Sequence, residues 1–359
     1  MIENSFWINK QVLVTGHTGF KGSWLSLWLN NLGAKVHGLA LDPPTQPNLF
    51  TIANIKSLLA SDTRLDIQKS TDVKKLLCTI KPEIVFHLAA LPLVQYAYDF
   101  PLDTYAVNVM GTVNILEAIR ICDSVRAAVI ITTDKCYEND ERNLSYSEKD
   151  RLGGKDPYSS SKACAELVTS AYRASYFSNK SNIHMASARA GNVIGGGDWA
   201  TDRLIPDCIR AYTDQRPMTL RFPNAVRPWQ HVLESIHGYI LLAEHLLSKK
   251  GSDFAEAWNF GPEMEDMKPV GYVAKMICDQ LNIPLNMPVQ EQKRHEASLL
   301  RLDSSKAQER LNWHATWNLE KAIEETIQWY RYWINGCDMV EYSRLQLESY
   351  LLTQKEMVY

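Results

Sequence analysis

The stretch that decides the fold is Thr15-Gly16-His17-Thr18-Gly19-Phe20-Lys21-Gly22, which is followed at once by SWLSLWLNNLG at 23–33. The preceding QVLVT at 11–15 has the pattern of a buried strand, and the residues after the turn carry apolar side chains at helical spacing. Glycines at 16, 19 and 22 allow a tight turn and let the helix N-terminus approach a pyrophosphate, whose charge its N–H groups and dipole favour. This strand, turn and helix predict a dinucleotide site that includes Gly16, Thr18, Gly19, Phe20, Lys21 and Gly22. A purely structural glycine turn is the alternative.

Short β-branched runs alternate with longer amphipathic segments through the first half of the chain. This alternation is typical of a parallel sheet with crossover helices, so we predict an α/β fold with a Rossmann-type, doubly wound parallel sheet. The expected strands are Gln11–Thr15, Lys35–Leu41, Ile84–Leu88, Ala127–Thr132 and Ile183–Arg189. The expected helices are Lys21–Leu32, Lys69–Ile80, Asp103–Ile121 and Pro157–Phe177.

After about residue 190 the pattern changes, because Gly195-Gly196-Gly197-Asp198-Trp199 and four prolines break up the chain before residue 230. Loop-rich segments of this kind often carry ligand contacts. We expect residues 1–190 to form the dinucleotide-binding Rossmann domain, with 232–262 returning to it, and 191–231 with 263–359 to form a smaller, loop-rich, substrate-binding lobe. Within these parts, helices are predicted at Ile236–Leu247, Pro269–Leu281 and Leu319–Trp333, and a strand at Ala257–Phe260.

Composition limits the classes of partner and the compartment. The chain has 38 Lys plus Arg against 41 Asp plus Glu, with no long run of one sign, so nothing indicates a nucleic acid or membrane partner. Its seven cysteines are widely spaced and form no Cys-x-x-Cys pair, which disfavours a disulfide framework and a metal site. No stretch approaches the ~18 apolar residues of a membrane span, and a cytoplasmic location is expected.

Acidic and small residues at the strand ends predict which dinucleotide binds. Asp42 follows the second strand about twenty residues after the last glycine, where a carboxylate would hydrogen-bond the adenosine ribose and repel a 2′-phosphate, which favours NAD over NADP. Asp66-Ile67 is placed to hold the adenine amino group, and Leu88-Ala89-Ala90 lets backbone lie close to the cofactor ribose. A solvated turn at Asp42 and simple helix packing at 88–90 are the alternatives. His17 and Lys21 could be mistaken for ligands of a 2′-phosphate, but a solvated helix start is expected for both side chains.

A Tyr-x-x-x-Lys pattern indicates the redox chemistry. Tyr158 and Lys162 lie four residues apart on a predicted helix, so both side chains project from one face. The lysine charge and a nearby nicotinamide are expected to lower the pKa of the phenol, so that a tyrosinate takes a hydroxyl proton as hydride leaves the same carbon. Thr133, at the end of the fifth strand, is placed to hydrogen-bond the same oxygen.

Asp134 and Lys135 are unusual beside such a site. A plain reductase or epimerase does not need them, whereas elimination of a hydroxyl β to a ketone needs one group to take the carbon-bound proton and another to protonate the leaving oxygen. We assign Lys135 as the base and Asp134 as the acid. Lys135 must then lose its proton, which burial and a neighbouring cation such as Lys162 would favour, and burial must keep Asp134 protonated. An ordinary turn ion pair is the alternative.

At these residues the chain resembles the extended short-chain dehydrogenase/reductase family, and within it the nucleotide-sugar 4,6-dehydratases that act on CDP-glucose. The match is carried by TGHTGFKGSWLSLWL at 15–29, TTDKCYEN at 132–139, RAGNVIGGGDWA at 189–200, RPWQHV at 227–232, AWNFGP at 257–262 and HEASLLRLDSSKA at 295–307. Similar dehydratases for dTDP-glucose and GDP-mannose carry Asp-Glu or Glu in place of Asp134-Lys135, so the resemblance favours the CDP-glucose branch.

The resemblance implies a tightly held, internally recycled NAD and the product CDP-4-keto-6-deoxy-glucose, a precursor of dideoxy sugars in surface polysaccharides such as O-antigen. It also implies substrate-binding residues. Asn192 and Arg227 would hold the diphosphate, which a guanidinium can grip with two parallel hydrogen bonds. The further candidates for the nucleotide-sugar substrate are Asn108, Arg203 and Arg301.

The chain departs from the family pattern at three positions, and rival functions stay open. Leu91 stands where relatives carry Gln, Gln95 where they carry Arg, and Ser298 where close relatives carry His. The rivals are a nucleotide-sugar 4-epimerase or 4-ketoreductase of the same fold, or a dehydratase of another nucleotide sugar, and a silent NAD-binding subunit.

A homodimer or a dimer of dimers is expected, paired through the predicted helices Asp103–Ile121 and Pro157–Phe177.

Overall fold

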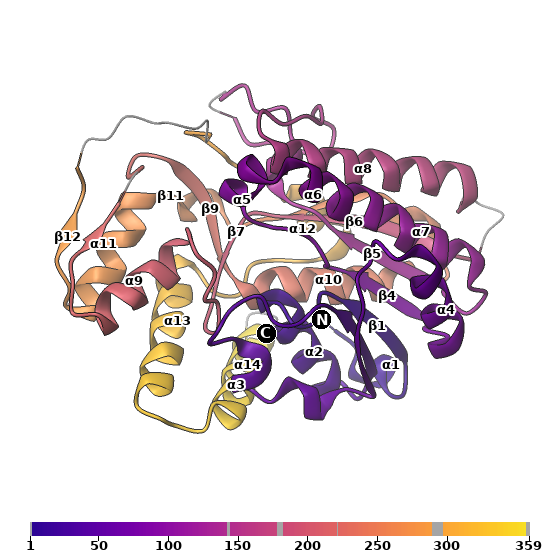
Figure 1. Cartoon of the computed structure of the whole chain (residues 1–359), viewed down its shortest axis with the longest axis horizontal. Helices are drawn as coiled ribbons and strands as arrows, with labels where there is room; N and C mark the ends of the chain where they lie inside the picture. The colour runs from indigo at the N-terminus through magenta and orange to yellow at the C-terminus, as the bar shows by residue number, and fades with distance from the viewer. Residues whose placement is uncertain (1, 142–143, 178–181, 221, 289–296, 357–359) are drawn as a thin grey trace.

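A computed structural model of the chain describes residues 2–141, 144–177, 182–220, 222–288 and 297–356. Within these residues, the main sheet contains seven strands in the order β10-β6-β5-β4-β1-β2-β3, and every pair of neighbours is parallel (Figure 1). The predicted doubly wound parallel sheet is therefore confirmed. The strands are β1 Gln11–Thr15, β2 Lys35–Ala40, β3 Ser61–Arg64, β4 Ile84–His87, β5 Ala127–Ile131, β6 His184–Ala190 and β10 Ala257–Phe260.

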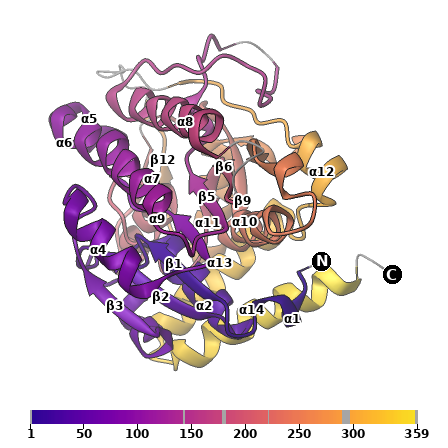
Figure 2. The ribbon, with the colours of Figure 1, turned by 90° about the vertical axis from the view of Figure 1, so that its right-hand side faces the viewer.

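Helices cover both faces of this sheet, as Figure 2 shows. One layer contains α4 Ser70–Ile80, α7 Thr112–Ile121 and α8 Pro157–Tyr176, and the other contains α2 Phe20–Asn31 and α10 Val232–Leu246. Side chains of a strand alternate between the faces, so Leu13 joins the core under the first layer, whereas Val12 and Val14 join the core under the second. Burial on both faces explains why these strands are continuously apolar.

The strand order fixes where a ligand can bind. The chain winds outward from β1 through β2 to β3, and then returns to start again at β4 on the other side of β1. In open α/β sheets, ligands bind outside the carboxyl ends of the strands at this reversal. The glycine turn after β1 and the segment after β4 lie at this point.

The C-terminal half adds a second lobe beside the sheet, at the left of Figure 1. Its three-stranded sheet has β9 Val226–His231 between β7 Asn192–Ile194 and β11 Met267–Pro269, and a short pair joins β8 Met218–Thr219 to β12 Leu285–Asn286. The helices around it are α9 Leu204–Thr213, α11 Val270–Leu281 and α13 Leu319–Ile334. The hydrophobic core under α2 and α10 continues into these helices, so the two lobes share one apolar interior.

The C-terminal half also returns to the main sheet. β10 pairs with β6, and α10 packs on β5 and β6. These contacts support the assignment of residues 232–262 to the dinucleotide-binding part, while the lobe boundaries stay a proposal. The remaining helices are α1 Asn4–Trp7, α3 Leu49–Ile52, α5 Val94–Asp99, α6 Pro101–Tyr105, α12 Ser305–Leu311 and α14 Met339–Glu356.

Several elements differ from the sequence prediction, among them α9, which lies in the stretch expected to be loop-rich, and two others. The single helix predicted at Asp103–Ile121 is divided into α6, a π-helical segment at Ala106–Gly111 and α7. π-helical segments are rare and have no simple sequence pattern. The helix α14 was not predicted, because its sequence has a large share of polar residues. From its middle, Leu347 and Tyr350 bury large apolar side chains.

Some features can be stated only for the described part of the chain. There, no helix is long and apolar enough to cross a membrane, and no cluster of three His, Cys, Asp or Glu side chains could hold a metal ion. All seven cysteines are free thiols. His295 and Glu296, which open the stretch HEASLLRLDSSKA used for the family resemblance, lie outside the described residues.

Candidate active site

The glycine turn has the geometry that a pyrophosphate site requires. Gly16 has a φ of +74°, and a Cβ there would lie 2.8 Å from the backbone nitrogen of Ala89. A Cβ on Gly22 would lie 2.1 Å from the carbonyl oxygen of Gly16, so only glycine fits at either position. Gly19 caps α2 without any side-chain hydrogen bond, and its own Cβ would meet nothing closer than 3.4 Å. The N–H groups of the first turn are thus left without a side-chain cap, and the residues present fit an anionic ligand.

The segment after β4 is tied to this turn. Thr15 Oγ1 accepts hydrogen bonds from the backbone N–H groups of Leu88 and Ala89, at 3.1 Å each. Ile67 is buried, and the Asp66 carboxylate accepts hydrogen bonds from the backbone and side chain of Gln68. The expected contact of Asp66 with adenine stays a prediction, as does a cofactor role for the backbone at Leu88-Ala89-Ala90.

Tyr158 and Lys162 lie on the face of α8 that is turned toward the sheet, and both are buried. The Lys162 Nζ donates to the Ile131 carbonyl oxygen at 3.2 Å, at the end of β5. Burial lowers the pKa of Lys162 to about 8 and raises the pKa of Tyr158 to about 12, although a hydrogen bond with Thr133 opposes the latter shift. Desolvation outweighs the nearby charge of Arg203, so the protein's own groups leave the phenol pKa raised, and the lowering expected with a bound nicotinamide stays a prediction.

Asp134 begins a short 3₁₀ turn, Asp134–Cys136, directly after β5. Its Oδ1 accepts a hydrogen bond from Thr133 Oγ1 at 3.0 Å, and its buried Oδ2 has no hydrogen-bond partner among the described residues. Burial raises the pKa of Asp134 even though Lys135 opposes this shift, in the direction that the sequence predicts. A buried carboxyl with one unused oxygen is suited to hold a proton and to donate it to a ligand.

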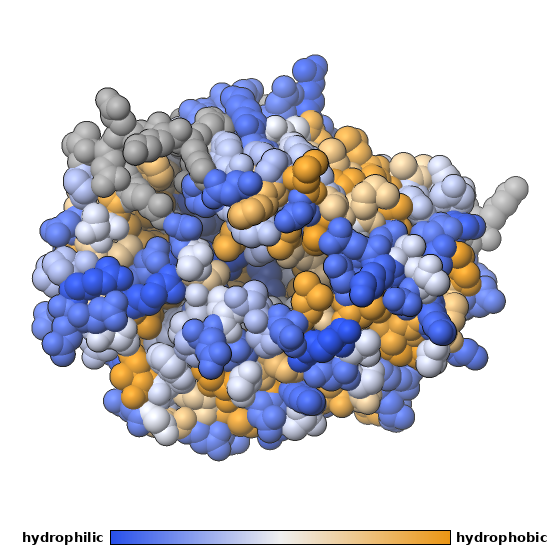
Figure 3. Space-filling view, viewed as in Figure 1, coloured by the Kyte–Doolittle hydropathy of each residue, from blue (hydrophilic) through white to orange (hydrophobic). Residues whose placement is uncertain are grey.

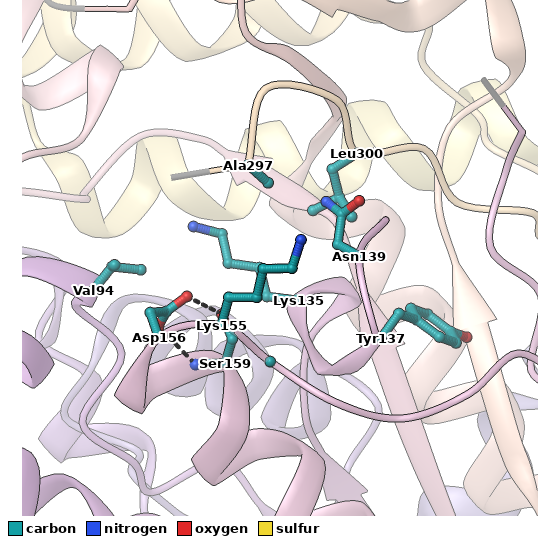
Figure 4. A pocket seen from close by; sticks show the side chains of 10 residues that line it. Val94, Lys135, Tyr137, Asn139, Lys155, Asp156, Ser159, Ala297 and Leu300 are labelled. Carbon is teal, nitrogen blue, oxygen red and sulfur yellow. Dashed lines mark hydrogen bonds between the residues drawn. The ribbon is translucent and has the colours of Figure 1, made fainter. Parts of the chain in front are cut away.

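Lys135 points into a small pocket, open to solvent, between α8 and the segment at 297–300 (Figure 4). The walls come from α5, from the chain after β5 and from the start of α8. In the close-up, Lys155 points into the same space as Lys135. The lining residues are Val94, Lys135, Tyr137, Asn139, Gly154, Lys155, Asp156, Ser159, Ala297 and Leu300.

Two of the predicted substrate-binding residues, Arg203 and Arg227, lie near the catalytic side chains. Arg227 is buried on β9, and its charge lowers the pKa of Asp134, which places the two side chains near each other. Arg203 caps α9, donates to Asp198 Oδ2 at 2.8 Å and acts electrostatically on Tyr158. Asn192 starts β7, beside β9, and Arg301 follows the pocket residue Leu300. Near its centre, the surface in Figure 3 is hollowed between the main sheet and this lobe.

The structure corrects the role expected for Asn108. Its side chain is buried in the π-helical segment, where Oδ1 accepts from the backbone N–H of Leu91 at 2.8 Å. Its amide donates to the Leu91 carbonyl oxygen and to Ser161 Oγ, at 3.1 and 2.9 Å. Asn108 therefore fixes the segment after β4 against α8 and does not face a substrate. Because these bonds use the backbone of Leu91, they do not depend on the residue type at 91.

Lys21 and His17 do not form a solvated helix start. His17 is fully buried and bonds Asp62. Lys21 is directed into the site, because Asp134, Lys162 and Arg203 all act on its charge, and burial lowers its pKa to about 7. The sequence places Lys21 at the dinucleotide site, but its direction toward Asp134 and Lys162 depends on how α2 lies against segments more than 100 residues away.

A buried ion pair behind the catalytic helix was also missed. Glu166 follows Lys162 by one helical turn and binds Arg189 Nη2 at 2.7 Å, and both side chains are at most 4% exposed. Glu166 also accepts from Thr132 Oγ1 at 2.5 Å and from Ser187 Oγ at 2.7 Å. The spacing 158, 162, 166 was a usable signal, because it places a carboxylate on the same helical face as the Tyr-Lys pair.

With this geometry in view, the chain can be compared with known proteins. The model of the GDP-mannose 4,6 dehydratase family matches residues 13–326. The chain belongs to this family. CDP-glucose 4,6-dehydratase of Salmonella typhimurium is 47% identical to it over 359 residues, covering 98% of this chain and 99% of the relative. A probable dTDP-glucose 4,6-dehydratase of Sinorhizobium fredii is 25% identical and covers 89% of this chain and 92% of that relative.

Solved structures agree with the family's fold. UDP-glucose 4-epimerase of Thermotoga maritima superposes with a TM-score of 0.77 at 19% identity, covering 90% of this chain and 99% of the epimerase. dTDP-glucose 4,6-dehydratase of Bacillus anthracis, in complex with NAD, gives 0.74 at 22% identity, covering 90% and 96%. At these identities the likeness shows the shared architecture, so the chemistry rests on the residues described above.

Proposed function

We propose that the protein catalyses the NAD-dependent 4,6-dehydration of a nucleoside diphosphate hexose, converting CDP-glucose to CDP-4-keto-6-deoxy-glucose and water. One observation carries this proposal. The buried Asp134 carboxyl and Lys135 lie directly beside Thr133 and Tyr158, so groups for elimination stand next to groups for oxidation. The 47% identical CDP-glucose 4,6-dehydratase supports the choice of substrate.

NAD fits the glycine turn, which offers uncapped N–H groups and close backbone packing. When bound, it would accept hydride from C4 of the hexose and return hydride to C6, so that no net redox change results. The chain would hold it through Gly16, Thr18, Gly19, Phe20 and Gly22 at the pyrophosphate and Asp42 at the ribose.

The first task of the protein is to remove a proton from the C4 hydroxyl. Tyr158 takes this proton, and Thr133 hydrogen-bonds the same oxygen. Because burial raises the pKa of Tyr158 to about 12, the phenolate must be stabilised by positive charge at the moment of transfer. Lys162 and Arg203 supply this charge from the protein.

The second task is elimination across C5 and C6. The C4 ketone acidifies the C5 hydrogen, Lys135 removes that hydrogen as a proton, and Asp134 donates a proton to the departing C6 hydroxyl, which leaves as water. When hydride returns to C6, C5 takes up a proton, which restores the saturated ring. Asp134 suits its role because burial favours its protonated form.

The nucleotide is proposed to bind along the second lobe. Arg227 and Arg203 place two guanidinium groups near Asp134 and Tyr158, and Asn192 lies on the neighbouring strand. Guanidinium groups suit a diphosphate because they pair with its oxygens in parallel hydrogen bonds. We assign these three residues, with Arg301 beside the pocket, to substrate binding.

The test is a substrate panel. The purified protein is incubated with CDP-, dTDP-, UDP- and GDP-hexoses without added NADH, and the products are identified by NMR. A 4-keto-6-deoxy sugar from CDP-glucose is expected, and C4 epimerisation without dehydration would instead support the epimerase alternative. Lys135→Ala should lose C5 proton exchange, while Lys249→Ala, at an exposed lysine far from the pocket, should behave as wild type. Normal exchange in Lys135→Ala would overturn the base assignment.

We further propose a homodimer that works in a reducing cytoplasm and supplies keto-deoxy sugars for surface polysaccharides. Free thiols at all seven cysteines are consistent with that compartment. Apolar surface is visible over α6 and α7 in Figure 3. In and beside α6, Phe100, Leu102 and Met110 are 51%, 84% and 54% exposed. Light scattering should give a dimer for the wild type and a monomer for Leu102→Glu, and a monomeric wild type would refute the dimer.

A further inference from the structure

A connected group of charged residues lies at the end of β2 and β3 that faces the glycine turn. Arg64, the last residue of β3, donates from Nε to Asp42 Oδ1 at 3.0 Å and from Nη1 to Asp62 Oδ1 at 2.7 Å. The same Nη1 is 3.2 Å from Nε2 of His17, which is 2.8 Å from Asp62 Oδ1. The guanidinium carbon lies 5.0 Å from the ring centre of Phe50. Arg64 is thus held by contacts on its edge and on its face.

This group occupies the position that faces the adenosine ribose in a Rossmann site. Arg64 pairs in register with Ala40, and Asp42 follows two residues later. Thr18 of the glycine turn donates to the Leu41 carbonyl oxygen at 3.0 Å, so the turn and the end of β2 are joined. A carboxylate here accepts hydrogen bonds from ribose hydroxyls, and an arginine here accommodates a 2′-phosphate. This chain carries both kinds of residue, and they bind each other.

The balance of charge explains why Asp42, and not Arg64, decides which dinucleotide the wild-type protein binds. Burial lowers the pKa of His17 despite its bond to Asp62, so the ring is neutral near pH 7. Asp42 and Asp62 then outnumber the single guanidinium of Arg64, which leaves the group with a net charge of about −1. A doubly charged 2′-phosphate is repelled by this group, whereas a neutral ribose hydroxyl is not. The Asp42 side chain is 88% exposed, so solvent and ligand can both reach its outer oxygen.

We propose that Arg64 sets the dinucleotide selectivity of this protein: it orients Asp42 toward the ribose of NAD, and it becomes the ligand of the 2′-phosphate of NADP when the charge of Asp42 is removed. Arg64 thereby acts as a positioning residue in the wild-type protein. The guanidinium needed for NADP is already in place and is masked by one exposed carboxylate. This inference rests on the proposed binding of NAD.

The experiment compares the full-length wild type with Asp42→Asn, Arg64→Gln and the double variant, after any copurifying dinucleotide has been removed. Isothermal titration with NAD and with NADP gives the Kd of each. Asp42→Asn should bind NADP about tenfold more tightly than the wild type, because a negative charge beside a doubly charged phosphate has been removed. Adding Arg64→Gln should reverse most of that gain. Arg64→Gln alone should raise the Kd for NAD by a few fold, because Asp42 loses the hydrogen bond from Arg64 that orients it.

Salt gives a second readout that a merely structural role would not change. The NADP gain of Asp42→Asn should shrink when NaCl rises from 0.05 to 0.5 M, as screening weakens the contact of Arg64 with phosphate. The inference is overturned if Asp42→Asn binds NADP no better than the wild type, or if the double variant keeps the full gain. A wild type that binds neither dinucleotide would instead refute the proposed function, and circular dichroism shows whether each variant is folded.

Discussion

The ion pair behind the catalytic helix gives a prediction whose size can be worked out from its contacts. In Glu166→Gln the shape is kept, but Arg189 is left as a buried charge without its partner. Breaking a buried pair by removing one partner costs about 3–5 kcal/mol of unfolding free energy. In Glu166→Gln, the amide oxygen can still accept hydrogen bonds but the amide nitrogen cannot. The two oxygens of Glu166 accept from Thr132, Ser187 and Arg189, so at least one of these bonds is lost. We therefore expect a loss of about 3–5 kcal/mol at pH 7.

The loss should depend on pH in a defined direction. Burial opposes ionisation of Glu166, but Arg189 and the hydrogen bonds outweigh it and lower the pKa of Glu166 below 4.5. A depressed carboxyl pKa contributes stability that is fully present above the unfolded value and is lost as the pH falls through the folded value. The difference between wild type and Glu166→Gln should thus be constant from pH 6 to 8 and shrink below about pH 4.5.

Urea unfolding followed by tryptophan fluorescence measures this difference, after reversibility has been checked. Glu324→Gln is the matched control, because its partner Lys321 and Glu324 itself are 41% and 56% exposed, and it should change stability by less than about 0.5 kcal/mol. Since Glu166 also raises the pKa of Lys162, the alkaline limb of the activity profile should move to lower pH in Glu166→Gln. A loss below about 1 kcal/mol, or one that grows in acid, would refute this account of the pair.

Three further predictions concern single side chains. Tyr158→Phe should lower kcat by about 10²–10⁴-fold in a steady-state assay with CDP-glucose, since it removes the group that takes the C4 proton; wild-type turnover would contradict that role. Asp134→Asn should still form the C4 ketone but release little 4-keto-6-deoxy product. In the wild type, the rate of elimination should fall as the pH rises through the raised pKa of Asp134. An unchanged product ratio by NMR would count against Asp134 as the acid. Burial raises the pKa of Glu234 to about 7, so the wild type should lose about 3 kcal/mol between pH 5 and 8 from this group, and urea unfolding of Glu234→Gln should lack that slope. Equal slopes in the two proteins would refute this.

The sequence predicts the sheet well, because its signals are local. Val12, Leu13 and Val14 place apolar side chains on both faces of the sheet. At Gly16 and Gly22, any Cβ would clash with backbone atoms. These properties belong to a few neighbouring residues, so pattern and turn chemistry are enough to find them.

The parts that the sequence does not predict depend on contacts between distant segments. Arg64 meets Asp42 only because β3 lies beside β2, and Lys21 enters the site only because α2 packs near the end of β5. Asn108 was expected at the substrate, but the π-helical turn directs it to the backbone of Leu91. Burial raises the pKa of Tyr158, an effect that the sequence does not show because desolvation depends on the whole fold.

The central claim is that one site oxidises C4 and then uses Lys135 and Asp134 to eliminate the C6 hydroxyl. It is tested most directly by NMR and mass spectrometry of the product formed from CDP-glucose in D₂O without added NADH. The account predicts CDP-4-keto-6-deoxy-glucose with one deuterium at C5, because the proton that Lys135 removes is replaced from solvent. A product that retains its original C5 hydrogen, or an absence of 4-keto product from every nucleoside diphosphate hexose, would contradict it.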